Sequence, residues 1–423
     1  MNMPIFQGGS SLSSVVPEEV GMSSDKASLL VNELNIRINQ GHLPGAVLMA
    51  VRNHKIAVHE AIGFRDRIAN SPMQKDTIFR IASMTKPIVS VGVLMLAEQG
   101  KLSLEDPLAN YLPEFENIQV GVEKTNSEGK RELSLVPSRK KITLQDLMRH
   151  TSGLTYGWDK NALVDQLYDK HQILSIDQTL EEQMKKLAAL PLKHQPGTTW
   201  EYGLSTDVLG RVIEVISGES LDVFLKKNIL NPLEMIDTDF GVTPDKLNRM
   251  AEAQINPETG QRYINVASGV KPKKFSGGGG LTSTALDFAK FCQMILNKGE
   301  LNGQVILSRK SIELMTANHL PDTTTYPDAN LFEWGSAMPL PAHFGTGFGL
   351  GFKVRLEAGK NPSSGSVGDL TWMGIWGTSF VIDPKENLIL ILLTQQPNRL
   401  TDYHRLLRQM GYAMLQNSTQ GNL

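Results

Sequence analysis

Arg80-Ile81-Ala82-Ser83-Met84-Thr85-Lys86-Pro87 leads directly into an apolar run, Ile88 to Gln99, which Gly100 ends. The run predicts a buried helix. If that helix begins near Ser83, the side chains of Ser83 and Lys86 lie one turn apart on the same face. A lysine amine accepts the proton of a serine hydroxyl where its surroundings favour the neutral amine. The stretch therefore predicts a nucleophilic serine at the start of a helix, with Lys86 as its base.

The start of the predicted helix suits this chemistry. Its unpaired N–H groups and partial positive charge stabilise a developing oxyanion, and Pro87 fits the first turn, where its missing N–H is not needed. The simpler alternative is a helix cap followed by a solvated lysine, because Ser-x-x-Lys alone is a common pattern. The decision rests on whether the chain supplies the other parts of a catalytic centre.

The composition is that of an ordinary globular protein. The 423 residues are 40% hydrophobic and 20% charged, enough for two domains or for one large domain with an insertion. A net charge of -2 gives no electrostatic reason to expect a nucleic acid or a membrane as partner. Cys292 is the single cysteine and lies in the apolar run Phe288–Leu296, so we expect a buried core residue there.

Several other activities lack their motifs. The chain has no His-Glu-x-x-His, no Walker loop, no Gly-x-Gly-x-x-Gly and no Gly-x-Ser-x-Gly. We therefore expect neither a metal nor a cofactor, and a small molecule as the partner; the oligomeric state is not indicated. Residues 1–20 show no signal peptide, and no apolar run is long enough to span a bilayer, which predicts a cytoplasmic protein.

Apolar, β-prone runs lie near both ends of the chain, and helical patterns fill its middle. Strands are predicted at 44–50, 56–64, 348–356, 379–382 and 388–393. Helices are predicted at 24–41, 88–99, 285–296 and 401–416, with further helical patterns over 160–190, 204–217 and 219–229. Residues 120–141 look like a polar, exposed excursion, and 320–345 look irregular.

This order predicts one sheet assembled from N- and C-terminal segments, with a helical part inserted between them. We place a loose lead-in at 1–22, an α/β domain at 23–86 together with 255–423, and a mainly helical inserted domain at 87–254.

Two later segments offer the parts that a Ser/Lys centre still needs, a proton shuttle and a second oxyanion donor. Tyr202 lies between the turn at 195–197 and a helix, where it would serve as a shuttle or simply pack on Trp200. The glycine-containing segment 371–377 brings a backbone N–H close to a ligand or only forms a turn before a strand. His150 would form a Ser/His pair or, more simply, pack beside a helix end.

The motifs in their order resemble those of the serine β-lactamase-like superfamily, most closely the family VIII carboxylesterases and the fungal acyltransferase that loads the statin side chain. The resemblance covers about residues 20 to 415. The segments that carry it are Ser83-Met84-Thr85-Lys86, Leu147 to Leu154, Pro196-Gly197 with Tyr202, Gly278-Gly279-Gly280-Leu281 and Trp372-Met373-Gly374.

The resemblance implies an α+β fold, with an antiparallel sheet flanked by helices and a largely helical second domain. It also implies roles: Ser83 as the acylated nucleophile, Lys86 as its base and Tyr202 as the proton relay. Backbone N–H groups of Ser83 and Ile375 would hold the oxyanion, with Trp372 and Gly374 shaping that wall.

Two positions depart from the penicillin-recognising members. Leu204 stands where those enzymes carry an asparagine, and Trp372-Met373-Gly374 replaces their Lys-Thr-Gly or His-Thr-Gly. A buried carboxylate without a polar partner is costly, so both changes disfavour anionic β-lactams. We predict a serine hydrolase of carboxylic esters with short to medium acyl chains. The alternatives are an acyltransferase, a β-lactamase or D-amino-acid peptidase, or a catalytically silent penicillin-binding-type protein.

Overall fold

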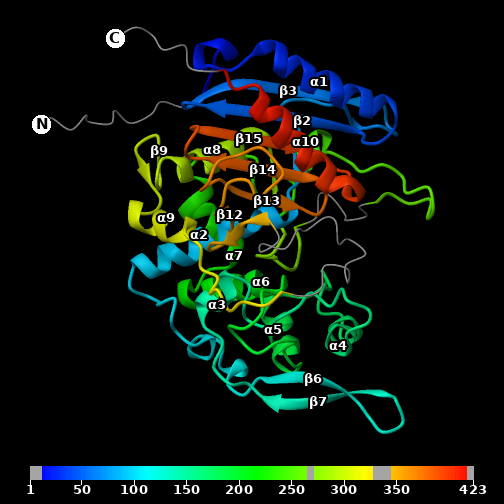
Figure 1. The fold of residues 1–423 in the computed structure, drawn as a ribbon, viewed down its shortest axis with the longest axis vertical. Coiled ribbons are helices and arrows are strands. Elements are labelled where there is room, and N and C mark those ends of the chain that lie inside the picture. Colours follow the sequence, from blue (N-terminus) through cyan, green and yellow to red (C-terminus); the bar gives the residue numbers. More distant parts are fainter. Residues whose placement is uncertain (1–11, 264–270, 327–343, 417–423) are drawn as a thin grey trace, which may run out of the picture.

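The computed structural model describes residues 12–263, 271–326 and 344–416. Its main sheet, in the order β1-β3-β2-β15-β14-β13-β12-β11 with β4 paired to β3, crosses the upper half of Figure 1. Every neighbouring pair in it is antiparallel except β1 and β3. The strands are β1 (Ser13–Ser14), β2 (Gly45–Arg52), β3 (Lys55–Asp66), β4 (Ser71–Pro72), β11 (Thr346–Phe348), β12 (Lys353–Arg355), β13 (Leu370–Gly374), β14 (Thr378–Asp383) and β15 (Leu388–Leu393).

The central strand β15 shows why helices cover both faces of this sheet. Its sequence is apolar throughout, and alternate side chains point to opposite faces. Leu388, Leu390 and Leu392 pack in a core with α1 (Ser24–Asn39) and α10 (Leu400–Ala413). Their neighbours Ile389, Ile391 and Leu393 pack in the larger core with α8 (Ala285–Leu296). The predicted sheet from both ends of the chain, flanked by helices, is confirmed.

A mainly helical part lies below the sheet in Figure 1. Helix α2 (Thr85–Glu98) packs against α6 (Ser205–Ser217) and α7 (Leu221–Leu225) of that part. Gly92 of α2 allows this close approach, because a Cβ there would lie 3.2 Å from both Ile213 and Phe224. The elements of the lower part are β6 (Gln119–Thr125), β7 (Arg131–Pro137), α3 (Leu144–Met148), α4 (Leu163–Lys170), α5 (Leu180–Ala188), α6 (Ser205–Ser217) and α7 (Leu221–Leu225). Further short elements are β5 (Phe79–Arg80), β8 (Thr282–Ser283), β9 (Glu300–Leu301), β10 (Gln304–Val305) and α9 (Arg309–Thr316).

Some local expectations were wrong, and others were incomplete. The predicted strand 348–356 is split into β11 and β12, because Gly351 between them takes a φ of +104° that ends a strand. The excursion 120–141 is mostly exposed, as expected, but it forms the hairpin β6–β7, which was not predicted. The strand β13 was not predicted either. The described end of the lead-in, 12–22, is not loose, since β1 pairs with β3. Most of the irregular segment 320–345 lies outside the described residues.

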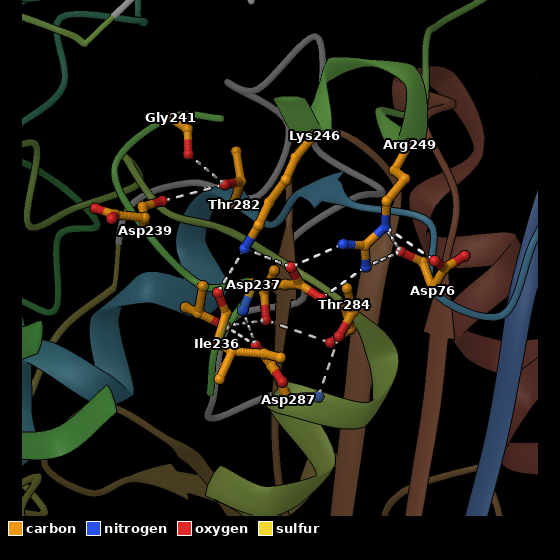
Figure 2. Close-up of polar contacts among 12 residues, drawn as sticks. Asp76, Ile236, Asp237, Asp239, Gly241, Lys246, Arg249, Thr282, Thr284 and Asp287 are labelled. Atoms are coloured by element: carbon orange, nitrogen blue, oxygen red, sulfur yellow. Dashed lines mark hydrogen bonds and ion pairs between the residues drawn. The ribbon is translucent and has the colours of Figure 1, made fainter. Parts of the chain in front are cut away.

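A network of ion pairs fixes the segment that returns from the helical part to the sheet (Figure 2). The Asp237 carboxylate accepts two hydrogen bonds from Arg249, at 2.9 and 2.6 Å, and pairs with Lys246 at 2.8 Å. Asp287, in the first turn of α8, accepts the Asp237 N–H at 2.7 Å and the Thr238 hydroxyl at 3.0 Å. The return segment is therefore bound to the helix that covers the sheet.

Candidate active site

The Lys86 side chain lies in the first turn of α2 and is almost fully buried, with 1% of its surface exposed. Its Nζ lies 3.2 Å from Ser83 Oγ, 2.9 Å from the hydroxyl of Tyr156 and 2.5 Å from the carbonyl oxygen of Gly278. A lysine amine has at most three hydrogen-bonding positions beside its bond to Cε, and the structure gives it these three oxygen partners. The amine is thus held in one orientation beside the serine.

Ser83 belongs to a short 3-10 turn, Ala82–Met84, and α2 itself begins at Thr85. The residue before it, Ala82, has a φ of +45°, a left-handed conformation that alanine seldom adopts. Such backbone persists only where the surroundings fix it. Here the Ile81 N–H donates to Leu281 O at 3.1 Å, and the Leu281 N–H donates to Thr85 Oγ1 at 3.1 Å.

The segment β13–β14 closes on the same turn from the other side. The Thr378 hydroxyl donates to Ile81 O at 3.2 Å. Gly374, the last residue of β13, packs so closely that a Cβ there would lie 2.2 Å from that same carbonyl oxygen. Ile375 begins the turn between the two strands. The structure therefore brings Gly374, followed by Ile375, beside the backbone that precedes Ser83.

Tyr202 and Trp372 also lie in this cluster. Lys86 Nζ is 4.6 Å from the centre of the Tyr202 ring, and Trp372 Nε1 donates to the Tyr202 hydroxyl at 3.3 Å. The ring of His150 lies 4.9 Å from that of Tyr202. Burial lowers the pKa of His150 well below its ordinary value, with a smaller contribution from the charge of Lys86. Tyr202 thus contacts both the amine and Trp372, and the His150 ring packs against the Tyr202 ring.

Tyr156 is the residue that sequence reasoning missed, although its hydroxyl directly contacts Lys86. Burial raises the pKa of Tyr156 well above its usual value, and the neighbouring Tyr202 and Asp207 add to this shift. The phenol is therefore a neutral hydroxyl at ordinary pH. The one signal for it was its place two residues after Leu154, the end of a motif already singled out. The Gly278 carbonyl was missed because the type of a residue does not show where its backbone carbonyl points.

Cys292 is fully buried in α8, and burial raises the pKa of its thiol well above the ordinary value. A neutral thiol closed off from solvent is inert. No helix within 12–263, 271–326 or 344–416 has the length and apolar character that a bilayer span requires.

The site is therefore a cluster of serine, lysine and tyrosine side chains on an α+β scaffold. Comparisons of this chain with known proteins agree with that description. The Beta-lactamase family model matches residues 29–413, and the chain belongs to this family. The chain is 29% identical over 368 residues to Esterase EstB of Burkholderia gladioli, with 84% of this chain and 87% of that protein covered.

Two solved structures share the fold. EstCE1, described as a hydrolase with promiscuous acyltransferase activity, is 25% identical with a TM-score of 0.72, covering 92% of this chain and 99% of that one. Simvastatin synthase (LovD) from Aspergillus terreus is 26% identical with a TM-score of 0.75, covering 94% and 100%. The predicted superfamily and fold class are confirmed, and the family includes both esterases and acyltransferases.

Proposed function

We propose that the protein is a carboxylesterase, of the family VIII kind, that hydrolyses neutral esters with short to medium acyl chains through an acyl-enzyme on Ser83. The observation that supports this proposal most strongly is the position of the Lys86 amine between Ser83 Oγ and the Tyr156 hydroxyl. An amine within hydrogen-bond reach of a hydroxyl is the geometry that nucleophile activation needs.

The first half of the reaction forms the acyl-enzyme. Lys86 takes the proton of the Ser83 hydroxyl while Oγ forms a bond to the ester carbonyl carbon. The carbonyl oxygen becomes an oxyanion, held by backbone N–H groups of Ser83 and Ile375. The tetrahedral intermediate then collapses, the bond to the alcohol oxygen breaks, and that oxygen leaves as the alcohol with the proton passed on through Tyr202.

The second half returns the enzyme to its starting state. A water molecule gives a proton to the Lys86–tyrosine network and attacks the acyl carbon. The carbonyl reforms as the bond to Ser83 Oγ breaks, Oγ regains a proton, and the carboxylic acid leaves. Tyr156 supports both halves, because it connects Lys86 to the neighbouring Tyr202.

The surroundings support a neutral substrate. Leu204 is fully buried, and the Trp372 side chain is only 5% exposed, with its N–H engaged by Tyr202. Neither residue offers a charge to a substrate carboxylate. An anionic β-lactam would therefore lose solvation without gaining a partner from these two positions.

Acyl transfer to a second alcohol is the other candidate, favoured by one observation. EstCE1, one of the two structural neighbours described above, is described as a hydrolase with promiscuous acyltransferase activity. The same acyl-enzyme would serve, with an alcohol in place of water. Adding a competing alcohol during ester turnover separates the two candidates, since a transferase forms the new ester as its main product.

Intact-mass spectrometry after reaction with a neutral p-nitrophenyl phosphonate tests the proposal. We expect one adduct per chain, located on Ser83, and none in the Ser83→Ala variant. The same variant should lose hydrolysis of p-nitrophenyl butyrate. A Ser83→Ala protein that hydrolyses this ester at the wild-type rate would overturn the assignment.

Removing the two phenol hydroxyls one at a time should separate their roles. Tyr156→Phe and Tyr202→Phe are each expected to lower kcat by about 10²-fold or more, because each hydroxyl lies in the proton path. Trp372→Phe keeps an aromatic ring but removes the N–H that meets Tyr202 and part of the ring volume, so a loss of about tenfold or less is expected. Steady-state kinetics with p-nitrophenyl butyrate measure all three. A Tyr156→Phe protein with wild-type kcat would remove Tyr156 from the proton path.

A further inference from the structure

The backbone carbonyl of Gly278 makes the shortest of the three polar contacts of Lys86 Nζ, at 2.5 Å. A carbonyl oxygen only accepts hydrogen bonds, so one N–H of the amine must point at Gly278. The remaining directions are those toward Ser83 Oγ and the Tyr156 hydroxyl. An N–H that points at Gly278 cannot also point at Ser83, so the position of this carbonyl restricts how the amine is oriented toward Ser83 Oγ.

Asp207 holds the backbone on the other side of Gly278. This residue lies in the first turn of α6 and is 3% exposed. Its Oδ1 accepts the Ser276 hydroxyl at 2.6 Å and the Gly278 N–H at 3.1 Å. Gly278 is thus bound twice, through its N–H by the carboxylate and through its carbonyl by the amine.

The packing around this glycine leaves little room for another arrangement. A Cβ on Gly278 would lie 3.1 Å from Asp207 Oδ2 and 3.2 Å from the Tyr156 hydroxyl. A Cβ on the preceding Gly277 would lie 2.5 Å from the carbonyl oxygen of Thr206. The carboxylate, the phenol and the glycine backbone meet at one point, which explains why the charge of Asp207 contributes to the raised pKa of Tyr156.

We propose that Asp207 is a positioning residue for the reaction: it fixes the turn 276–278 so that the Gly278 carbonyl orients the Lys86 amine toward Ser83. This inference rests on the proposed function of Ser83 and Lys86. Both groups that Asp207 binds are neutral donors, a hydroxyl and a peptide N–H. The side chain therefore acts as a hydrogen-bond acceptor, and the side-chain oxygen of an asparagine in the same place would accept the same two hydrogen bonds.

Comparing Asp207→Ala with Asp207→Asn tests this role. Asp207→Ala is expected to lower kcat for p-nitrophenyl butyrate about 10²-fold with KM nearly unchanged, because misplacing a catalytic group by about 1 Å costs that much. Asp207→Asn should stay within about tenfold of the wild type, since its amide oxygen accepts both bonds. Equal losses in both variants, or wild-type kcat in Asp207→Ala, would overturn the proposal.

Asp287→Ala is the matched control. Asp287 is also a buried aspartate in the first turn of a helix, and it likewise accepts one backbone N–H and one hydroxyl. Its loss should lower the melting temperature about as much as that of Asp207 and leave kcat within about threefold of the wild type. An equal fall in kcat would mean that any such aspartate matters, which contradicts a specific role.

Gly278→Ala keeps Asp207 and covers the case in which Asp207→Ala does not fold. Its new methyl group would press on Tyr156 and Asp207 and displace the carbonyl, with an expected loss in kcat of about 10²-fold. Wild-type kcat in this variant would contradict the proposal.

A structural readout separates this inference from the proposed function. In a crystal structure of Asp207→Ala, we expect the Gly278 O to Lys86 Nζ distance to exceed about 3.5 Å, where a hydrogen bond is lost. An unchanged distance overturns the positioning role whatever the activity is. If the phosphonate does not label wild-type Ser83, the esterase assignment fails, and this distance still decides the role of Asp207.

Discussion

The Lys86→Met variant is expected to lower kcat/KM for p-nitrophenyl butyrate by about 10⁴-fold, at the upper end of what a general base contributes. Methionine has nearly the length of the lysine stem, so the buried position stays filled. What is lost is the one amine in contact with Ser83 Oγ among the described residues. Ser83 then has no base to take its proton.

Serine and lysine act as a unit, so the effects should not add. The double variant Ser83→Ala with Lys86→Met is expected to be about as inactive as either single variant. Lys353→Met is the control. Lys353 is also buried, with a pKa lowered to about 8 mainly by burial, but it lies near Arg408 of α10 on the opposite face of the sheet. Its replacement should leave kcat/KM within about threefold. A Lys86→Met protein with more than about a tenth of wild-type activity would contradict the assignment of the base.

Gly374→Ala should have the second large effect. Its Cβ would lie 2.2 Å from Ile81 O and 2.3 Å from Thr378 Oγ1, well inside contact distance. The strand must move away from the backbone that precedes Ser83, at a cost of about 1–3 kcal/mol in the free energy of unfolding. The same shift misplaces the oxyanion wall, and we expect kcat/KM to fall about 10²-fold or more. Urea unfolding and steady-state kinetics measure the two effects.

A second substitution identifies which contact matters. Thr378→Ala in the Gly374→Ala background removes the hydroxyl but leaves the closer carbonyl of Ile81, so activity should not return. Recovery to near wild-type kcat/KM in the double variant would show that the hydroxyl, and not the backbone before Ser83, excludes a side chain at 374.

The local part of the site was predictable because it depends on spacing alone. Lys86 lies three positions after Ser83, and one helical turn brings the two side chains together whatever the rest of the chain does. Tyr202 has no such relation to Lys86. Its position before a helix left two interpretations open, a proton shuttle or a packing residue, and the family resemblance favoured the shuttle. Tyr156 was missed for the same reason, since its contact with Lys86 arises from the packing of distant segments. The catalytic roles of all these residues stay predictions.

The misjudged elements also have physical causes. The hairpin β6–β7 faces solvent over most of its surface, and only Val120 and Gly121 in it are buried. The polar run from Glu123 to Arg131 at its centre was interpreted as a surface loop, although the alternation Leu133-Ser134-Leu135 beside it is typical of a strand. In β13 the residues Trp372 and Gly374 were interpreted as site features and a turn, although the pairing with β14 makes them part of a strand. Strand identity there is decided by a partner that the local sequence does not show.

The pairing of Ala50 with Leu390 has a consequence for how the chain is made. During synthesis on the ribosome, β2 emerges early, and the strand that covers its edge is among the last segments to appear. The helical middle is complete long before then. Until β15 arrives, the apolar β2–β3 ribbon has an open edge, the kind of surface that chaperones bind and that aggregates when left alone.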